Sequence, residues 1–210
     1  MYTVFIQNTP LHFCKKTDVP PALNQETHPV YHDMTGGKLI PNVVDMLEKS
    51  NRFDAIYLVG KDPKKLFDFF SQKYKLIEAG GGLVTNETGE VLIIYRLETY
   101  DLPKGKMDKG EIPRETAHRE VVEETGVKDL ITKDLLGITY HTYRNRKNKR
   151  VLKRTYWFKM EAPKQVLTPQ TDEDIQKAEW IAPKDIPDLY DNMYESIKMI
   201  LLDWLTSAQK

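Results

Sequence analysis

The spacing of apolar residues predicts that residues 1–75 form a compact β-β-α-β-α unit. Apolar and polar residues alternate over residues 2–7, which is typical of a half-buried strand, and a turn at 8–10 precedes its hairpin partner. An apolar stripe over 41–49 has the period of a helix. The pair Asp62-Pro63 is typical of a helix start. The expected elements are strands at 2–7, 11–15 and 54–59, helices at 41–49 and 62–74, and irregular chain at 17–36.

The pattern changes near Lys75, and residues 76–210 are predicted to form a second domain. Two apolar stretches, 76–84 and 90–96, predict strands, and three glycines inside the first allow close packing there. A charged loop at 104–110 leads into a predicted helix at 113–125. Beyond it we expect strands at 136–146, at 150–161 and around Glu179-Trp180-Ile181, and a final helix at about 191–206 whose apolar face includes Met193 and Ile197.

The composition narrows the class of protein. The 210 residues are 40% hydrophobic and 30% charged, with 31 basic and 31 acidic side chains. This balance excludes intrinsic disorder and disfavours a general polyanion binder, so no DNA partner is expected. The single cysteine, Cys14, excludes an internal disulfide and is expected to be a small buried residue. Since we find neither a secretory signal nor a run of ~18 apolar residues, we expect no membrane partner and a cytoplasmic location.

Three glutamates on one predicted helix carry the candidate chemistry. Glu120, Glu123 and Glu124 stand at positions i, i+3 and i+4, so they share one face within a sector of about 100°. Their like charges repel in an isolated helix, but a hard divalent cation such as Mg²⁺ would reverse that penalty. Arg119 can pair with Glu111 or Glu123 and hold a carboxylate in orientation.

A lone E-x-x-E-E pattern usually marks a solvated helix face, but the complete spacing here is far more specific. Nine constrained positions are filled within 23 residues: Gly105, Glu111, Arg119, Glu120, Val121, Glu123, Glu124, Gly126 and Val127. This spacing is that of the Nudix box, and residues 76–206 resemble Nudix hydrolases. The resemblance implies an α/β/α sandwich with a mixed sheet. It also implies metal-dependent cleavage of a nucleoside diphosphate linked to another moiety.

The resemblance further implies roles for single residues. The implied ligands of Mg²⁺, or of Mn²⁺, are Glu120, Glu123, Glu124 and the backbone carbonyl of Gly105. Arg119 and Glu111 would form the supporting ion pair. A metal-bound water would attack one phosphorus in line, with Glu124 or Glu123 as general base. The acidic run Asp172-Glu173-Asp174 is a second candidate for the base, and its alternative role is a solvated loop.

Two groups of basic residues bear on the substrate, which is expected to be a nucleotide-type small molecule. The stretch LPKGK resembles a subgroup of Nudix enzymes that act on diadenosine polyphosphates or on nucleoside triphosphates, including oxidised ones. Lys104 and Lys106 are therefore candidate phosphate contacts. The segment 144–154 carries seven positive and no negative side chains, which makes Arg144 and Arg154 further candidates. The alternatives are exposed lysines and a charged hairpin tip that protects sheet edges.

Other functions and the role of the N-terminal region stay open at this level. A Nudix-fold sensor would recognise a nucleotide such as ADP-ribose without cutting it, and turnover and binding assays on the same nucleotides separate the two functions. An isoprenoid diphosphate isomerase would need an additional catalytic cysteine, whereas Cys14 lies outside the Nudix-like region. Residues 1–75 could cap the active site, form a homodimer interface or bind a partner.

Overall fold

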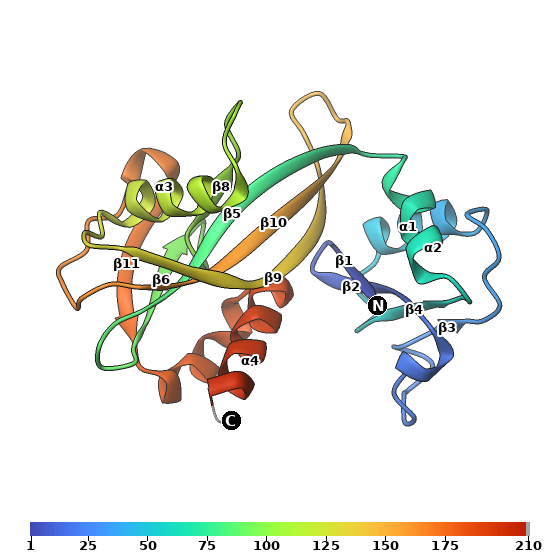
Figure 1. Ribbon diagram of the computed structural model, residues 1–210. Coiled ribbons are helices and arrows are strands. Elements are labelled where there is room, and N and C mark those ends of the chain that lie inside the picture. Colours follow the sequence, from blue (N-terminus) through green and yellow to red (C-terminus); the bar gives the residue numbers. More distant parts are fainter. Residues whose placement is uncertain (209–210) are drawn as a thin grey trace. The chain divides into compact units, whose positions relative to one another are not determined.

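The computed structural model describes residues 1–208 and divides the chain into two compact units (Figure 1). The first unit comprises Met1–Ile77 with Tyr140–Lys153, and the second comprises Glu78–Thr139 with Arg154–Lys210. The start of β5 (Lys75–Thr85) belongs to the first unit, and the two long strands β9 (Ile131–Arg144) and β10 (Arg150–Glu161) also contribute to both units. The tip of their hairpin therefore belongs with the N-terminal residues. Within the described residues, no helix is long and apolar enough to cross a membrane.

A small sheet and two helices form most of the first unit. The strands follow the order β1-β2-β4-β3, with β1 antiparallel to β2 and with β2 and β3 parallel to β4. On its other side, β1 pairs in parallel with the tip end of β9, where Val4 lies opposite Tyr140. The elements are β1 (Tyr2–Ile6), β2 (Thr9–Cys14), the 3-10 helix η1 (Lys16–Asp18), β3 (Val30–Tyr31), α1 (Ile40–Lys49), β4 (Ile56–Val59) and α2 (Pro63–Ser71).

Both faces of the first unit's sheet are covered. Leu47 of α1 and Phe70 of α2 pack on one face, in the core formed with β1, β2 and β4. The connection after β2 covers the opposite face through Val19 and Leu23, and Cys14 is buried there. Burial raises the pKa of the Cys14 thiol to about 11, which makes it a poor nucleophile at neutral pH. The prediction that Cys14 is a small buried residue is confirmed.

The first hairpin turn differs from the sequence prediction. The turn is formed by Gln7 and Asn8, with φ angles of 47° and 72°, and Ile6 pairs directly with Thr9. The prediction of a turn at 8–10 is therefore wrong. Two successive left-handed residues give a turn whose twist matches that of the strands it joins, so the shorter turn lets β2 begin earlier.

The predicted helices and the predicted strand at 54–59 agree with the structure in type and differ in length. Asp62 caps α2 as predicted, since its Oδ1 accepts a hydrogen bond from the backbone N–H of Lys65 at 3.0 Å. The helix ends at Ser71, before the predicted end at Tyr74. The segment 17–36, predicted to be irregular, contains the short strand β3, which pairs with β4. A strand of two residues is too short to show an alternation of apolar and polar residues, so the sequence could not predict it.

The second unit is built on a sheet with the order β11-β6-β5-β10-β9. Its short strands β7 and β8 pair with β6 and β5, and β6 is antiparallel to both β5 and β11. The remaining elements are β5 (Lys75–Thr85), β6 (Val91–Arg96), β7 (Thr99–Asp101), β8 (Lys104–Lys106), α3 (Pro113–Thr125), η2 (Thr171–Glu173), β11 (Ile175–Ile181), η3 (Pro183–Asn192) and α4 (Glu195–Ala208).

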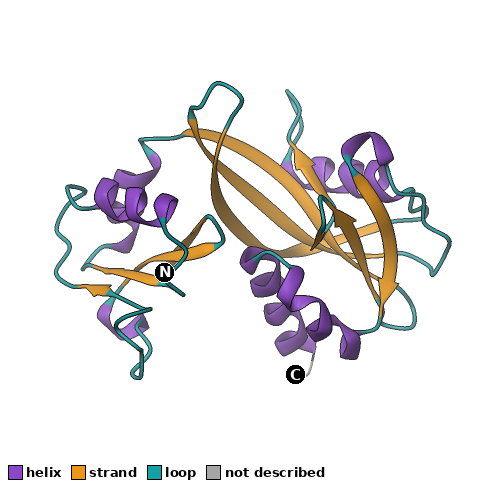
Figure 2. Ribbon diagram, turned by 180° about the vertical axis from the view of Figure 1, so that it is seen from behind, coloured by secondary structure: helices purple, strands orange, loops and turns teal. Residues whose placement is uncertain are grey.

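Helices cover both faces of this second sheet (Figure 2). Val121 of α3 packs in the core that contains Leu92, whereas Ile197 of α4 packs in the core that contains Ile93. Leu92 and Ile93 are neighbours on β6, and successive side chains of a strand point to opposite faces. The alternation along β6 therefore separates the two helical layers. The predicted α/β/α sandwich with a mixed sheet is confirmed.

A close contact at Gly80 fixes α3 against β5. A Cβ atom at this position would lie 2.5 Å from the backbone nitrogen of Ala117 and 2.6 Å from the carbonyl oxygen of Pro113. The helix backbone therefore rests directly on the strand, which confirms the close packing expected from the glycines. Since β8 pairs with the same part of β5, opposite Gly80, this contact also brings α3 beside β8.

The C-terminal helix begins later than predicted. Residues 183–192 form the 3-10 helix η3, and α4 begins at Glu195 rather than near residue 191. Met193 therefore precedes α4, although it is buried in the same core as Ile197. The proline inside η3, Pro187, cannot donate the backbone hydrogen bond that a longer α-helix would require.

Candidate active site

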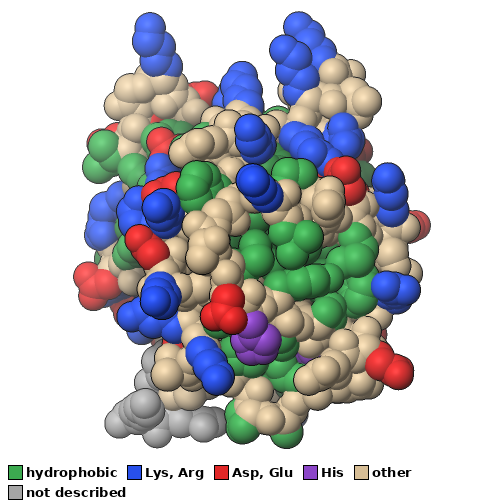
Figure 3. Space-filling view, turned by 90° about the vertical axis from the view of Figure 1, so that its right-hand side faces the viewer, with side chains coloured by type: hydrophobic (Ala, Val, Ile, Leu, Met, Phe, Trp, Pro, Cys, Tyr) green, Lys and Arg blue, Asp and Glu red, His purple; other side chains and the backbone are tan. Residues whose placement is uncertain are grey.

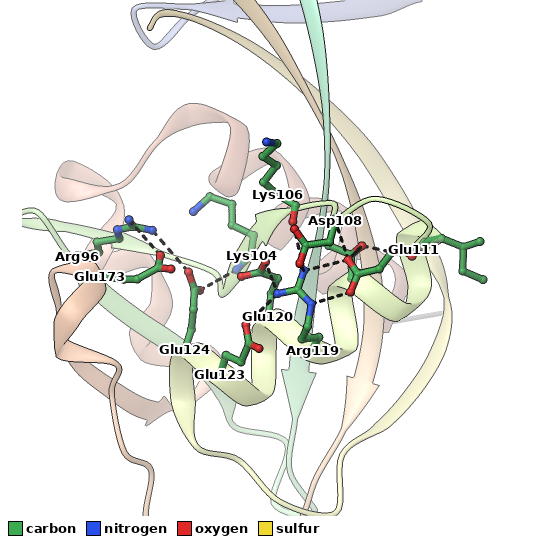
Figure 4. A network of polar contacts seen from close by, with 12 residues as sticks. Arg96, Lys104, Lys106, Asp108, Glu111, Arg119, Glu120, Glu123, Glu124 and Glu173 are labelled. Atoms are coloured by element: carbon green, nitrogen blue, oxygen red, sulfur yellow. Dashed lines mark hydrogen bonds and ion pairs between the residues drawn. The ribbon is translucent and has the colours of Figure 1, made fainter. Parts of the chain in front are cut away.

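The candidate site lies where α3 meets β8, within the second unit (Figure 4). Pro113 starts α3, and Gly126 ends it in the left-handed conformation, with φ of 66°. The helix bounds match the prediction of 113–125. The helix presents Glu120 and Glu124 as buried residues and Glu123 as a more exposed one. These three side chains therefore differ in environment although they share a helix face.

Arg119 contacts three glutamates of the candidate site. It donates from Nε and Nη2 to the two carboxylate oxygens of Glu111, at 2.7 and 2.9 Å. Its Nη1 reaches Glu120 Oε1 at 2.8 Å and Glu123 Oε2 at 2.9 Å. The Arg119 guanidinium holds the pKa of Glu111 well below its usual range, at about 2. In turn, the hydrogen bonds that Arg119 donates to Glu111 raise the pKa of Arg119, so the pair stays ionised.

Glu120 lies against the backbone of Gly105 in β8. A Cβ atom at Gly105 would lie 1.9 Å from Glu120 Oε2, so no other residue fits here without displacing this carboxylate. Glu120 is only 7% exposed, and burial raises its pKa despite the nearby Arg119. The glycine required by the box pattern thus provides the space that a buried carboxylate occupies.

Glu124 is the most deeply buried acid of the site. Its Oε2 accepts a hydrogen bond from the backbone N–H of Lys104 at 2.8 Å, whereas Oε1 is buried without a hydrogen-bond partner. The nearest cation to Oε1 is Arg96, whose Nη1 lies 3.5 Å away. Burial raises the pKa of Glu124 to about 7, and Lys104 and Arg96 oppose this rise. The carboxyl group can therefore exchange a proton near neutral pH.

Arg96 and Asp101 belong to the network but were not among the residues singled out from the sequence. Arg96 also reaches Glu173 of η2, with Nη2 3.5 Å from Oε2, so one acid of the 172–174 run lies beside the box carboxylates. Asp101 accepts a hydrogen bond from the Lys104 Nζ at 2.6 Å. Arg96 is the last residue of β6, and Asp101 is the last residue of β7. The residues around them in the sequence do not indicate which side chains they contact.

The two candidate lysines have different environments. The Lys104 ammonium is buried, which by itself would lower its pKa, but Asp101 and Glu124 outweigh this effect and the pKa is raised. Lys106 is exposed, and its side chain points away from Arg119, although its backbone carbonyl accepts a hydrogen bond from Arg119 Nη2 at 3.2 Å (Figure 4). Lys104 thus has an internal partner, and Lys106 faces solvent.

The two candidate arginines of the basic segment fall in different units. Arg154 lies in the second unit and forms an ion pair with Glu78, which also accepts a hydrogen bond from the Tyr156 hydroxyl. Arg144 lies in the first unit, where its Nη2 contacts Glu48 Oε2 at 2.8 Å. The positive segment is therefore partly neutralised by acids from elsewhere in the chain.

The donor set fits a hard divalent cation. Glu120, Glu123 and Glu124 offer only carboxylate oxygens, which Mg²⁺ prefers, and the buried Oε1 of Glu124 accepts no hydrogen bond, its one cationic neighbour within 4 Å in the described chain being Arg96 at 3.5 Å. In the described part of the chain, no three acidic, histidine or cysteine side chains converge as a ready-made metal cluster. Arg119 instead bridges Glu120 and Glu123, as a positive charge between two acids.

Comparisons with known proteins agree with this geometry. A NUDIX domain profile matches residues 76–201. The chain is 37% identical over 62 residues to an 8-oxo-dGTP diphosphatase of Haemophilus influenzae, a match that covers 27% of this chain and 46% of that protein. It is 40% identical over 65 residues to an 8-oxo-(d)GTP phosphatase of Mycolicibacterium smegmatis, covering 30% of this chain and 20% of that protein. The chain thus matches less than half the length of these relatives.

A solved structure shares the fold. The MutT protein from Methanosarcina mazei Go1 aligns with a TM-score of 0.51 and 21% identity, over 66% of this chain and 99% of that chain. At this level of identity the similarity concerns the fold alone.

Proposed function

This chain belongs to the Nudix family, and from that membership we propose that it is a divalent-metal-dependent pyrophosphohydrolase that cleaves a phosphoanhydride bond in a nucleoside diphosphate derivative. The observation that carries the proposal is that Glu120, Glu123 and Glu124 share one face of α3, with a buried carboxylate oxygen of Glu124 left without a hydrogen-bond partner. A purely structural helix face would not be expected to bury such an oxygen, because an unsatisfied acceptor costs about 1–3 kcal/mol.

We assign separate roles to the residues that would hold the metal and to those that would orient its ligands. We assign the metal, Mg²⁺ or Mn²⁺, to Glu120, Glu123 and Glu124, with the Gly105 carbonyl as a further ligand. When bound, such a cation shields phosphate charge and lowers the pKa of water. Arg119, held by its two bonds to Glu111, would orient the Glu120 and Glu123 carboxylates.

Glu124 is our first choice for the group that takes the proton from the attacking water. Its Oε2 is held by the backbone N–H of Lys104 at 2.8 Å, which leaves the buried Oε1 as the oxygen that would accept the proton. Glu123, whose side chain is 49% exposed, is the second choice because it can move without disturbing the core. Glu173 is the member of the 172–174 run to test third, since Arg96 links it to Glu124.

The proposed substrate is a nucleotide with extra phosphates. One relative is named an 8-oxo-dGTP diphosphatase and another an 8-oxo-(d)GTP phosphatase, which makes an oxidised nucleoside triphosphate the first compound to test and a diadenosine polyphosphate the second. Lys104, Lys106 and Arg154 are proposed phosphate contacts within the second unit. Arg144 is proposed as a phosphate contact only because it is positively charged. Its ion pair with Glu48 makes it a weaker candidate than the other three.

Glutamine substitutions test the function. The hydrolysis of 8-oxo-dGTP, diadenosine tetraphosphate and ADP-ribose should be measured with Mg²⁺ and with Mn²⁺. Glu123→Gln and Glu124→Gln should each lower turnover by orders of magnitude, whereas Glu179→Gln, on an exposed strand position of the same unit, should keep it. Equal activity in all three variants would refute the assignment. Binding of a nucleotide without any turnover would favour the sensor function.

A further inference from the structure

A large cavity lies in the first unit. Its volume is about 870 Å³, which falls within the roughly 300–1,000 Å³ typical of small-molecule sites. All of its lining residues fall between Lys15 and Leu66. The cavity is therefore formed by the N-terminal residues that the Nudix match does not cover.

The cavity lies at the carboxyl ends of three parallel strands. β2 ends at Cys14, β3 at Tyr31 and β4 at Val59, and the residues that follow each of these strands line the cavity. The connections after β2 and after β3 cover opposite faces of the sheet, one through Val19 and the other through α1, which includes Val43. In open α/β sheets, such divergence opens a crevice at the carboxyl edge, and ligands bind there.

The lining carries an excess of positive charge over an apolar floor. Lys15, Lys16, Lys61 and Lys65 face two aspartates, Asp33 and Asp62. One of the two, Asp62, already accepts the backbone N–H of Lys65 as the cap of α2. Across the described chain, none of these four lysines forms an ion pair with a carboxylate. Lysine ammonium groups are common binders of phosphate oxygens.

The apolar part of the lining suits the rest of such a ligand. Val59 and Leu66 are buried and Met34 is half-buried, and all three line the cavity. Gly60 allows the backbone of Met34 to approach closely, because a Cβ at position 60 would lie 2.7 Å from the Met34 carbonyl oxygen. Figure 3 shows one face of the molecule, on which an apolar area is bordered by lysine and arginine side chains and by some acidic and histidine side chains.

We propose that this cavity is a second ligand site, which binds a nucleotide with its phosphates on Lys16, Lys61 and Lys65 and its base or sugar over Val59 and Leu66. The site is separate from the carboxylates of α3 and does not depend on the proposed hydrolase activity. A nucleotide matches both the size of the cavity and its division into a basic rim and an apolar floor.

The test measures binding of ADP to the full chain in EDTA, by isothermal titration calorimetry. Without a divalent cation the α3 carboxylates repel phosphate, so binding there is suppressed. Lys16→Gln/Lys61→Gln/Lys65→Gln should raise the Kd for ADP at least tenfold. The control Lys49→Gln/Lys73→Gln/Lys75→Gln changes three exposed lysines of the same unit that do not line the cavity, and it should leave Kd within twofold. Adenosine, which lacks phosphate, should not bind measurably.

Amide hydrogen exchange locates the bound ADP. The Met34 N–H donates to the Val59 carbonyl at 2.9 Å, and the Gly60 N–H donates to the Cys14 carbonyl at 3.0 Å. These bonds tie the cavity edges together, so ADP should slow exchange at both amides. Equal ADP affinity in the two triple variants, or slowed exchange confined to residues 104–124, would overturn the proposal. Circular dichroism of both triple variants verifies that they are folded.

Discussion

Arg119 and Glu111 face each other through two parallel hydrogen bonds, Nε to Oε1 at 2.7 Å and Nη2 to Oε2 at 2.9 Å. This fork leaves Nη1 free of Glu111, and that nitrogen contacts Glu120 and Glu123. The loop residue Glu111 therefore sets the position of the arginine, and the arginine sets the position of two candidate metal ligands. Only a planar guanidinium can make both sets of contacts at once.

Replacing Arg119 by lysine tests whether the site needs only its positive charge or also its two-point hydrogen bonding to Glu111. A lysine side chain would keep the positive charge but lose the fork, so we expect Arg119→Lys to lower metal-dependent kcat/KM by about 10–100-fold, as is typical when a group that orients metal ligands is changed. The activity should be titrated with Mg²⁺. Arg114→Lys is the matched control, because Arg114 lies on the same helix and bonds backbone carbonyls at Thr132 and Lys133. Similar losses in both variants would contradict the assigned role.

Gly105→Ala should displace Glu120. The added Cβ would lie 1.9 Å from Glu120 Oε2, a separation that forces the carboxylate to move. We expect at least a tenfold loss of turnover and a destabilisation of about 1–3 kcal/mol, which is usual for overpacking. Gly137→Ala is the control, since its Cβ would meet only the Ile200 Cδ1, at 3.3 Å. Unchanged thermal midpoint and activity in Gly105→Ala would show that the contact is not needed.

His12 should make the stability of the first unit depend on pH. Its ring stacks on Tyr57 at 4.6 Å, and its Nδ1 lies 3.0 Å from Thr3 Oγ1. Burial, with a smaller contribution from His28, lowers the pKa of His12 to about 4. The unfolded chain therefore binds a proton below about pH 6.5, whereas the folded chain does so only near pH 4, and stability is lost as the pH falls between these values.

The His12→Gln variant measures this effect. Between pH 7 and pH 5, the free energy of unfolding should fall by about 1–2 kcal/mol more in the native chain than in His12→Gln, as followed by urea denaturation. His118→Gln, at an exposed position of α3, should behave like the native chain. Parallel pH profiles for all three proteins would contradict the predicted linkage.

Arg150 should stabilise the first unit more than its neighbours in the basic segment do. It bonds both oxygens of Glu48, from Nε at 2.9 Å and from Nη2 at 3.0 Å, and it also contacts Asp45. We expect Arg150→Gln to lower the free energy of unfolding by about 1–2 kcal/mol, because hydrogen bonds between charged groups are lost. Lys149→Gln, at the exposed tip, should have almost no effect. Equal denaturation midpoints would refute this difference.

The local elements could be predicted because they follow from short periods in the chain. The bounds of α3, Pro113 to Thr125, agree with the sequence prediction, since proline and glycine mark its two ends. Failures occurred where no period exists. The two-residue turn at Gln7-Asn8 carries no glycine, and β3 is too short to show alternation.

The sequence by itself determined that three candidate carboxylates of the second unit share a helix face, because helix geometry alone places residues i, i+3 and i+4 on one side. Tertiary structure decided which environment each acid has. Glu124 is buried beside Arg96, and Glu120 lies against Gly105, through contacts between segments that are distant along the chain. It also decided that lysines following separate strands line one cavity, because strand order, and not sequence order, determines which strand ends are neighbours.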